Sequence, residues 1–171
     1  MKILETERLQ ILEFRKEDAG FILELVNEPA WIEFIGDKNV TNLQDAANFI
    51  ENKLRPSYKE NGFGLFLVKL KEPTISIGMC GLVNRPGLDN IDIGFAFLAA
   101  HRKKGYAFES SKAMMAYAKD TLNIPTLVAI TNPNNVASGK LLEKLGFQFD
   151  KLIDLAKDGK DLCKLFIQKN T

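Results

Sequence analysis

The sequence has few of the residues that several kinds of functional site require. Among its 171 residues are one histidine, His101, and two cysteines, Cys80 and Cys163. This scarcity excludes histidine-rich metal sites and argues against a Ser-His-Asp hydrolase. The two cysteines are far apart, in apolar strand-like runs with no metal-ligand spacing. In a reducing compartment we expect both to be free thiols that serve as small core residues.

The sequence also lacks an excess of charge and a long apolar run. Twenty-three lysines and arginines against 22 aspartates and glutamates give a formal charge of +1, which argues against a broad basic face for nucleic acid. The longest apolar run, residues 93–100, is well short of the roughly 20 residues that a membrane span needs. The first ten residues show no apolar signal-peptide core. We therefore expect a cytoplasmic protein without nucleic-acid or membrane partners.

What the sequence does contain is the composition of a protein with a substantial core. Hydrophobic residues make up 46% of the chain and charged residues 26%, which is typical of a soluble folded domain. No repeat, low-complexity tract or linker divides the chain. We expect one domain over residues 1–171, as a monomer or a homodimer.

The first third of the chain is predicted to be mainly helical. Residues 8–14 alternate between polar and apolar, as a half-buried strand does, and residues 16–27 show a helical period that Pro29 ends. A capping-box pattern begins a second helix at Thr41, with the glutamine three positions on. Residues 31–36 between these helices are expected to form an aromatic loop.

The remaining two thirds mix strands and helices. Short turns separate the first three strands, which indicates antiparallel neighbours, and later segments alternate between strand and helix. The sequence therefore predicts an α+β, mixed three-layer α/β/α domain with a twisted, mostly antiparallel sheet. Residues 95–98 and 126–131 should be adjacent parallel strands with a gap between their carboxyl ends. The expected segments are strands at 63–70, 75–83, 90–98 and 126–131, helices after Gly105 and near 134–145, and a closing hairpin of 147–155 with 162–168.

Residues 95–107 form the most informative segment, an apolar strand that leads through a basic loop to a glycine and a helix. A helix N-terminus presents unpaired N–H groups to an anion, and Gly105 allows the backbone to approach a ligand closely. The loop matches neither the P-loop nor the dinucleotide-binding pattern. A phosphate-bearing ligand of another kind is favoured, and the alternative is a solvated basic turn.

The segment Arg102-Lys-Lys-Gly-Tyr-Ala107 resembles the pyrophosphate loop of the GNAT N-acetyltransferases, [QR]-x-x-G-x-[GA]. Further segments in matching order make the sequence similar to the RimJ/RimL-type branch over about residues 4–168. They are ETERL at residues 5–9, DIGF at 92–95, NPNNVAS at 132–138 and LEKLGF at 142–147. The sequence departs from the branch at residues 99–101 and at Lys103, where a glycine is common, and we expect these changes to tune affinity.

The resemblance implies a GNAT-like fold and acetyl-CoA as donor, without a metal ion. The strand ending in Phe95, Ala96 and Phe97 would pair with the pantetheine arm of the cofactor. Asn135 would contact the cofactor, and Ser138 would protonate the departing thiolate. Backbone N–H groups of the loop would bind the pyrophosphate, namely those of Lys103, Lys104, Gly105, Tyr106, Ala107 and Phe108.

Four side chains are candidates for chemistry, and each has a simpler alternative. Asp92 could act as a base, directly or through water, or could be a surface or ion-paired carboxylate. Ser138 could merely cap a helix. Glu33 could recognise a cationic acceptor or lie on the surface, and His101 could titrate or simply contact the phosphates.

Together these features predict an acetyl-CoA-dependent N-acetyltransferase that acts by direct transfer to a primary amine. The acceptor is expected to be a protein N-terminal α-amine or a small-molecule amine, recognised by residues 28–40 and the helix up to Tyr58. A non-catalytic acyl-CoA-binding or sensing module on the same fold is the alternative. A generic phosphate-binding domain is a third interpretation.

Overall fold

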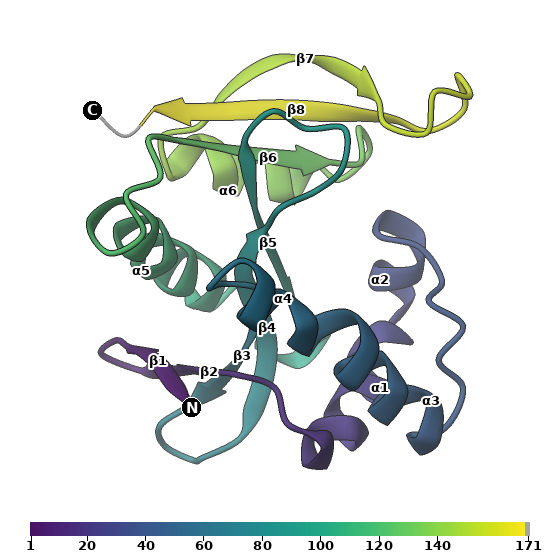
Figure 1. The fold of residues 1–171 in the computed structure, drawn as a ribbon, viewed down its shortest axis with the longest axis vertical. Helices are drawn as coiled ribbons and strands as arrows, with labels where there is room; N and C mark the ends of the chain where they lie inside the picture. The colour runs from purple at the N-terminus through teal and green to yellow at the C-terminus, as the bar shows by residue number, and fades with distance from the viewer. Residues whose placement is uncertain (170–171) are drawn as a thin grey trace.

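The computed structural model describes residues 1–169, which form one twisted sheet between two layers of helices (Figure 1). Neighbouring strands follow the order β1-β2-β3-β4-β5-β6-β8-β7 and are antiparallel except for β5 and β6. The expected α+β architecture with a mostly antiparallel sheet is confirmed. The strands are β1 Lys2–Glu5, β2 Leu9–Leu12, β3 Leu65–Leu70, β4 Ser76–Val83, β5 Ile91–Phe97, β6 Thr126–Thr131, β7 Gln148–Asp154 and β8 Leu162–Lys169.

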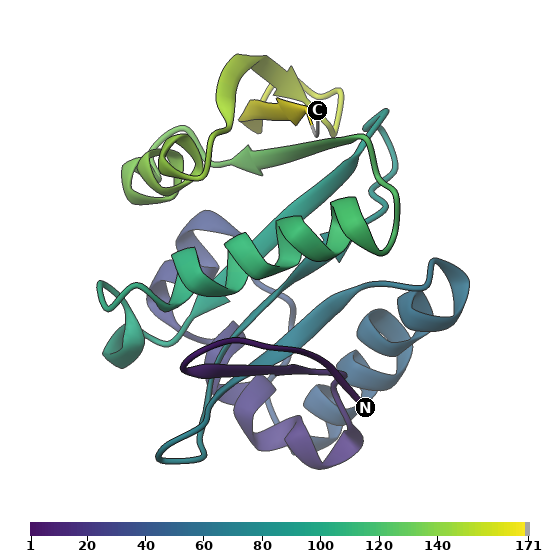
Figure 2. The same ribbon diagram turned by 90° about the vertical axis from the view of Figure 1, so that its left-hand side faces the viewer.

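The helices cover the sheet on both faces and create two hydrophobic cores. Helix α5 runs across one face of the central strands (Figure 2), where its Met114 is fully buried. On the other face, α1 and α3 bury residues such as Ile22 and Ala46 against the sheet. Neighbouring residues of one strand supply both cores, since Phe66 enters the first and Leu67 the second. The helices are α1 Ala19–Val26, α2 Pro29–Phe34, α3 Leu43–Phe49, α4 Arg55–Glu60, α5 Tyr106–Asp120 and α6 Val136–Lys144, with short turns η1 Lys16–Asp18, η2 Ile50–Leu54 and η3 Ala99–His101.

The N-terminal third differs from the prediction in three places. Residues 31–36 do not form an aromatic loop, because α2 occupies Pro29–Phe34. Pro29 stands at the first position of that helix, where its missing N–H would have no partner in any case. The next helix is capped by Asn42 and not Thr41, since the Asn42 side chain accepts the Asp45 N–H. Strand β1 was not anticipated; it pairs with β2 at the edge of the sheet.

The pairing of β5 with β6 is parallel, as predicted, but it is short and involves residues 91–92 instead of the predicted 95–98, because the strands diverge before that point. The ladder consists of Ile91 with Leu127 and Asp92 with Val128, and the two strands then diverge. Helix α5 connects them along the chain. Beyond Asp92, one edge of β5 is therefore left without a neighbouring strand. Within the described residues, no helix is both long and apolar enough to cross a membrane.

Candidate active site

The divergence of β5 from β6 opens a cavity of about 670 Å³ in the middle of the sheet. Helix α2, the end of α3 and η2 form one wall, and the two diverging strands form the floor. The N-terminal turn of α6 closes the opposite side. The five predicted residues that line the cavity are Asp92, Phe95, Ala96, Asn135 and Ser138. The fold thus gathers both predicted catalytic residues and part of the cofactor set around one space.

The free edge of β5 presents backbone groups to this space. The Leu98 N–H donates to the Ile77 carbonyl of β4 at 3.0 Å. In an antiparallel pair every second residue bonds to the same neighbour, so Ala96 also directs its backbone N–H and carbonyl groups toward β4. Phe95 and Phe97 therefore turn their N–H and carbonyl groups away from β4, toward the open side. The Phe97 carbonyl already accepts a hydrogen bond from Arg102 Nε at 2.9 Å. An extended ligand lying along this edge would pair chiefly with Phe95.

Asp92 is a buried carboxylate and not a solvated surface group. Its Oδ2 accepts from Arg85 Nε at 2.8 Å, while Oδ1 is buried without a hydrogen-bond partner among the described residues. Burial raises the pKa of Asp92 and the Arg85 guanidinium partly opposes this effect. The ion-paired alternative is thus confirmed for Oδ2.

Asn135 and Ser138 stand together at the start of α6. Asn135 is the N-cap, and its Oδ1 accepts the Ser138 N–H at 3.2 Å. The Ser138 side chain therefore has no capping role, because the cap is supplied by the asparagine. Both residues line the cavity opposite the α2 wall, and among residues 1–169 the Ser138 hydroxyl has no recorded hydrogen-bond partner.

The loop between β5 and α5 has the geometry of an anion site. Gly105 is the N-cap of α5 with a φ of +83°, and Lys103 also has a positive φ of +60°. Within the described part of the chain, the N–H groups of residues 103–108 donate to no protein acceptor. These groups and the helix dipole can hold a diphosphate. The loop residues do not line the cavity; they form the end of the β5 edge that leads away from it.

The N-terminal ETERL motif holds this loop in place, a role that the sequence did not reveal. Arg8 Nε pairs with Glu109 at 2.6 Å, its guanidinium donates to the Lys104 carbonyl at 3.0 Å, and it stacks on the Tyr106 ring. Thr6 donates to the same glutamate at 2.6 Å. Burial alone would raise the pKa of Glu109, but the hydrogen bonds from Thr6 and Arg8 outweigh it and lower that pKa.

Arg102 is less available to a ligand than its place in the motif indicates. Its guanidinium pairs with Glu28 Oε2 at 2.9 Å, and the same carboxylate accepts the Ala99 N–H. Glu28 precedes α2, so this pair connects the α2 wall of the cavity to the loop between β5 and α5. The loop's free charge comes from Lys103 and Lys104, both exposed.

Three other predicted side chains are placed as follows. Glu33 is exposed on α2 and is not among the lining residues, which supports its interpretation as a surface group. His101 is half-buried at the end of η3, beside the loop. Cys80 is a buried core residue, as expected, whereas Cys163 is only half-buried and lines the cavity. The core interpretation of Cys163 was wrong because β8 reaches the cavity from the far side of β6. Among the described residues, no three histidine, cysteine, aspartate or glutamate side chains lie close enough together to hold a metal ion.

Comparisons with known proteins agree with this geometry. Residues 8–148 match the model of the acetyltransferase (GNAT) domain family. A Bacillus licheniformis protein named as the uncharacterized N-acetyltransferase p20 is 29% identical over 157 residues, which cover 90% of this chain and 86% of that protein.

Two solved structures share the fold. An acetyltransferase from Agrobacterium tumefaciens superposes with a TM-score of 0.82 at 23% identity, covering 98% of this chain and 94% of the other. The microcin C7 self-immunity acetyltransferase MccE, whose structure holds acetyl-CoA and AMP, gives a TM-score of 0.81 at 16% identity, with coverages of 96% and 93%. The chain belongs to the GNAT acetyltransferase family.

Proposed function

We propose that this protein transfers an acetyl group from acetyl-CoA directly to a primary amine. The observation that carries the proposal is the continuous path from the cavity, along the free edge of β5, to the unpaired N–H groups of residues 103–108. The path offers the two recognition elements that an acyl-CoA needs, a strand edge for an amide-rich arm and an anion site for a diphosphate.

Successive residues along this path would contact successive parts of acetyl-CoA. The N–H groups of Lys103, Lys104, Gly105, Tyr106, Ala107 and Phe108 would bind the diphosphate. Phe95 and Phe97 would supply backbone groups to the pantetheine arm, with the Ala96 side chain facing the cavity. Asn135 would contact the arm from α6. When bound, acetyl-CoA supplies the thioester whose C–S bond is broken.

Two side chains that line the cavity would carry out the proton transfers of the reaction. The Asp92 carboxylate would accept a proton from the amine, directly or through water, so that the nitrogen lone pair can form the new C–N bond. The Ser138 hydroxyl would donate a proton to the departing sulfur as the C–S bond breaks, and would regain it from solvent. The raised pKa of Asp92, caused mainly by burial, makes it a stronger base than a solvated aspartate.

The thiols are poorly suited to a covalent acyl-enzyme route. Burial raises the pKa of Cys80 to about 11, and burial also raises the pKa of Cys163. A thiol with a raised pKa is protonated at neutral pH and is a weak nucleophile. Attack by the amine on the bound thioester needs no such intermediate.

Thiol release measured with acetyl-CoA and a panel of amines and N-terminal peptides tests the proposal, with mass spectrometry of the products. We expect an acetylated amine and initial-velocity lines that intersect. Parallel lines together with an acetylated cysteine would overturn direct transfer. Tight acetyl-CoA binding without thiol release to any amine would instead support the non-catalytic sensing module.

A further inference from the structure

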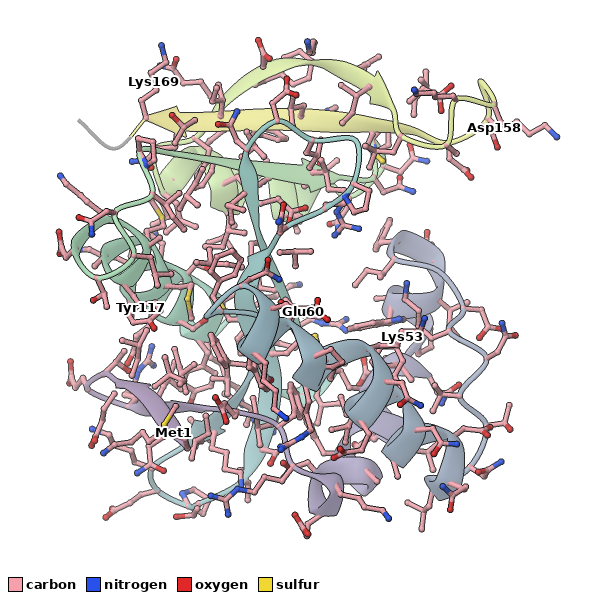
Figure 3. All side chains as sticks on the ribbon, viewed as in Figure 1. Met1, Lys53, Glu60, Tyr117, Asp158 and Lys169 are labelled. Carbon is pink, nitrogen blue, oxygen red and sulfur yellow. The ribbon has the colours of Figure 1, made fainter. Side chains whose placement is uncertain are left out.

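The wall of the cavity that faces the β5 edge carries positive charge without a matching negative charge. Lys38 follows α2, Lys53 lies on η2 near α2 (Figure 3), and Arg85 comes from the β4–β5 loop. Asp92 is the one acidic residue among the described lining residues, and it is already paired with Arg85. Within residues 1–169, no carboxylate lies within ion-pair distance of Lys38 or Lys53.

The acidic residues nearest in sequence to Lys38 and Lys53 make other contacts. Asp37 accepts the Asn39 N–H at 2.8 Å, and Glu51 pairs with Arg55. Asp154 and Asp161 act on Cys163 at the other end of the cavity and do not line it. Lys38 is exposed, but desolvation by the atoms around it, and after that the charge of Arg85, lowers its pKa. An anion beside Lys38 would relieve this repulsion.

The same wall supplies aromatic surface. Trp31, Phe34 and Phe49 line the cavity, and Trp31 is 6% exposed. Its indole Nε1 is buried without an acceptor among the described residues. These side chains give the cavity an apolar, aromatic wall.

These cations are separate from the phosphate-binding end of the path. None of the loop residues 99–108 lines the cavity, and the free N–H groups of the loop already account for the diphosphate. Lys38 follows α2, Lys53 lies on η2 and Arg85 lies in the β4–β5 loop, so none of them belongs to the loop between β5 and α5. We therefore assign their charge to the acceptor.

Resting on the proposed function, we infer that the acceptor is a small amine that also carries a carboxylate or phosphate group on an apolar or aromatic body. Lys38 and Lys53 would bind the anion, the aromatic wall would hold the body, and the amine would face Asp92. Polyamines, which carry positive charge at every nitrogen, do not suit this wall.

Binding can be followed without turnover, because Trp31 is the single tryptophan of the chain and lines the cavity. Its fluorescence would be titrated with 3-phenylpropionate and with phenethylamine, which share the phenylethyl body. We expect the carboxylate to bind at least about tenfold tighter, as one charge-assisted hydrogen bond can provide. Phenyl phosphate, titrated in parallel, distinguishes a phosphate preference from a carboxylate preference.

Matched lysine variants locate the anion. Lys38→Met and Lys53→Met should each weaken 3-phenylpropionate several-fold, whereas Lys59→Met, an exposed lysine of α4 outside the cavity, should leave its affinity unchanged. Equal or tighter binding of phenethylamine, no response to either probe, or unchanged affinity in both cavity variants would overturn the inference.

Turnover separates this inference from the proposed function. Acetylation of phenylalanine should exceed that of phenethylamine, and the ratio should fall in Lys38→Met. Acetyl transfer that favours phenethylamine or spermidine would overturn the inference and leave the proposed function intact. Binding of 3-phenylpropionate without transfer to any amine would overturn the proposed function and leave an anion site in the cavity.

Discussion

The two ends of the path through this protein are built in different ways. The proposed cofactor loop is one contiguous stretch, residues 99–108, and it offers mainly backbone N–H groups at the start of α5. The cavity proposed for the acceptor is formed by side chains from α2, η2, the β4–β5 loop, β5 and α6. A backbone site depends on chain conformation and tolerates most side-chain changes. A side-chain site depends on each residue that lines it.

The interactions that hold the two ends also differ. The loop is fixed by Arg8 and Glu109 on one side and by the Arg102–Glu28 pair on the other, contacts that span about a hundred and about seventy positions. In the cavity, Lys38, Lys53 and the Ser138 hydroxyl have no recorded partner among the described residues. Unpartnered groups of this kind are available to a substrate, whereas the loop anchors are not.

The largest expected effect comes from changing the backbone site itself. Gly105→Asp should weaken acetyl-CoA at least about a thousandfold by calorimetry, because it places a Cβ and a negative charge where a φ of +83° and free N–H groups are needed. Gly62→Asp is the control, since Gly62 has a similar φ of +76° and open space around it. Equal affinity in wild type and Gly105→Asp would refute the placement of the diphosphate.

Removing one hydroxyl from the side-chain site should have the next largest effect. Ser138→Ala should lower kcat about a hundredfold, typical of lost general-acid help, and leave acetyl-CoA affinity unchanged. The helix should remain intact because Asn135 supplies the cap. A loss of less than about fivefold would show that Ser138 only positions the cofactor.

Replacing Asp92, the proposed base, should lower the rate less than the loss of the Ser138 hydroxyl does. At high pH the amine is already neutral and does not need a base. Asp92→Asn should lower kcat/KM about tenfold at neutral pH, with the deficit shrinking as pH rises. In the wild type, the carboxylate must be ionised to act, so the rate should fall as pH drops through its raised pKa. A pH–rate profile with the same acidic limb in both proteins would exclude Asp92 as the base.

The difference in stability between the wild type and Asp92→Asn should also depend on pH. Because the folded-state pKa of Asp92 is raised above the usual value of 3.8, its protonation favours the folded state. Its stabilising contribution is fully present below about 3.8 and is lost as pH rises through the raised folded pKa. Relative to Asp92→Asn, the wild type should therefore gain stability toward acid pH, measured by thermal unfolding across a pH series.

The smallest effect is expected for a cationic side chain of the loop. Lys103→Ala should weaken acetyl-CoA about fivefold or less, since an exposed cation near a helix N-terminus contributes little. Lys103→Gly removes the same charge and also the Cβ at a φ of +60°, so it should unfold at an equal or higher temperature than Lys103→Ala. A hundredfold loss of affinity in both variants would mean that this end also depends on side chains.

Much of the fold and the position of the loop between β5 and α5 could be predicted from the sequence. Period, turn residues and capping patterns are local, so β6 was located at Thr126–Thr131 as expected and α5 begins directly after Gly105. The errors lie where two local signals compete. Pro29 is compatible both with the end of one helix and with the start of another. The packing of Trp31 into the core favours the second, which is α2.

Only the tertiary structure decided how the remaining site residues meet. Arg8 and Glu109 are 101 positions apart, and Lys38, Arg85 and Cys163 share no spacing that marks a common cavity. The burial of Asp92 likewise follows from its neighbours and not from its own segment. The sequence by itself located the proposed cofactor end, because backbone conformation is encoded by consecutive residues. The acceptor end was decided by packing, because its chemistry depends on which distant side chains the fold brings around one space.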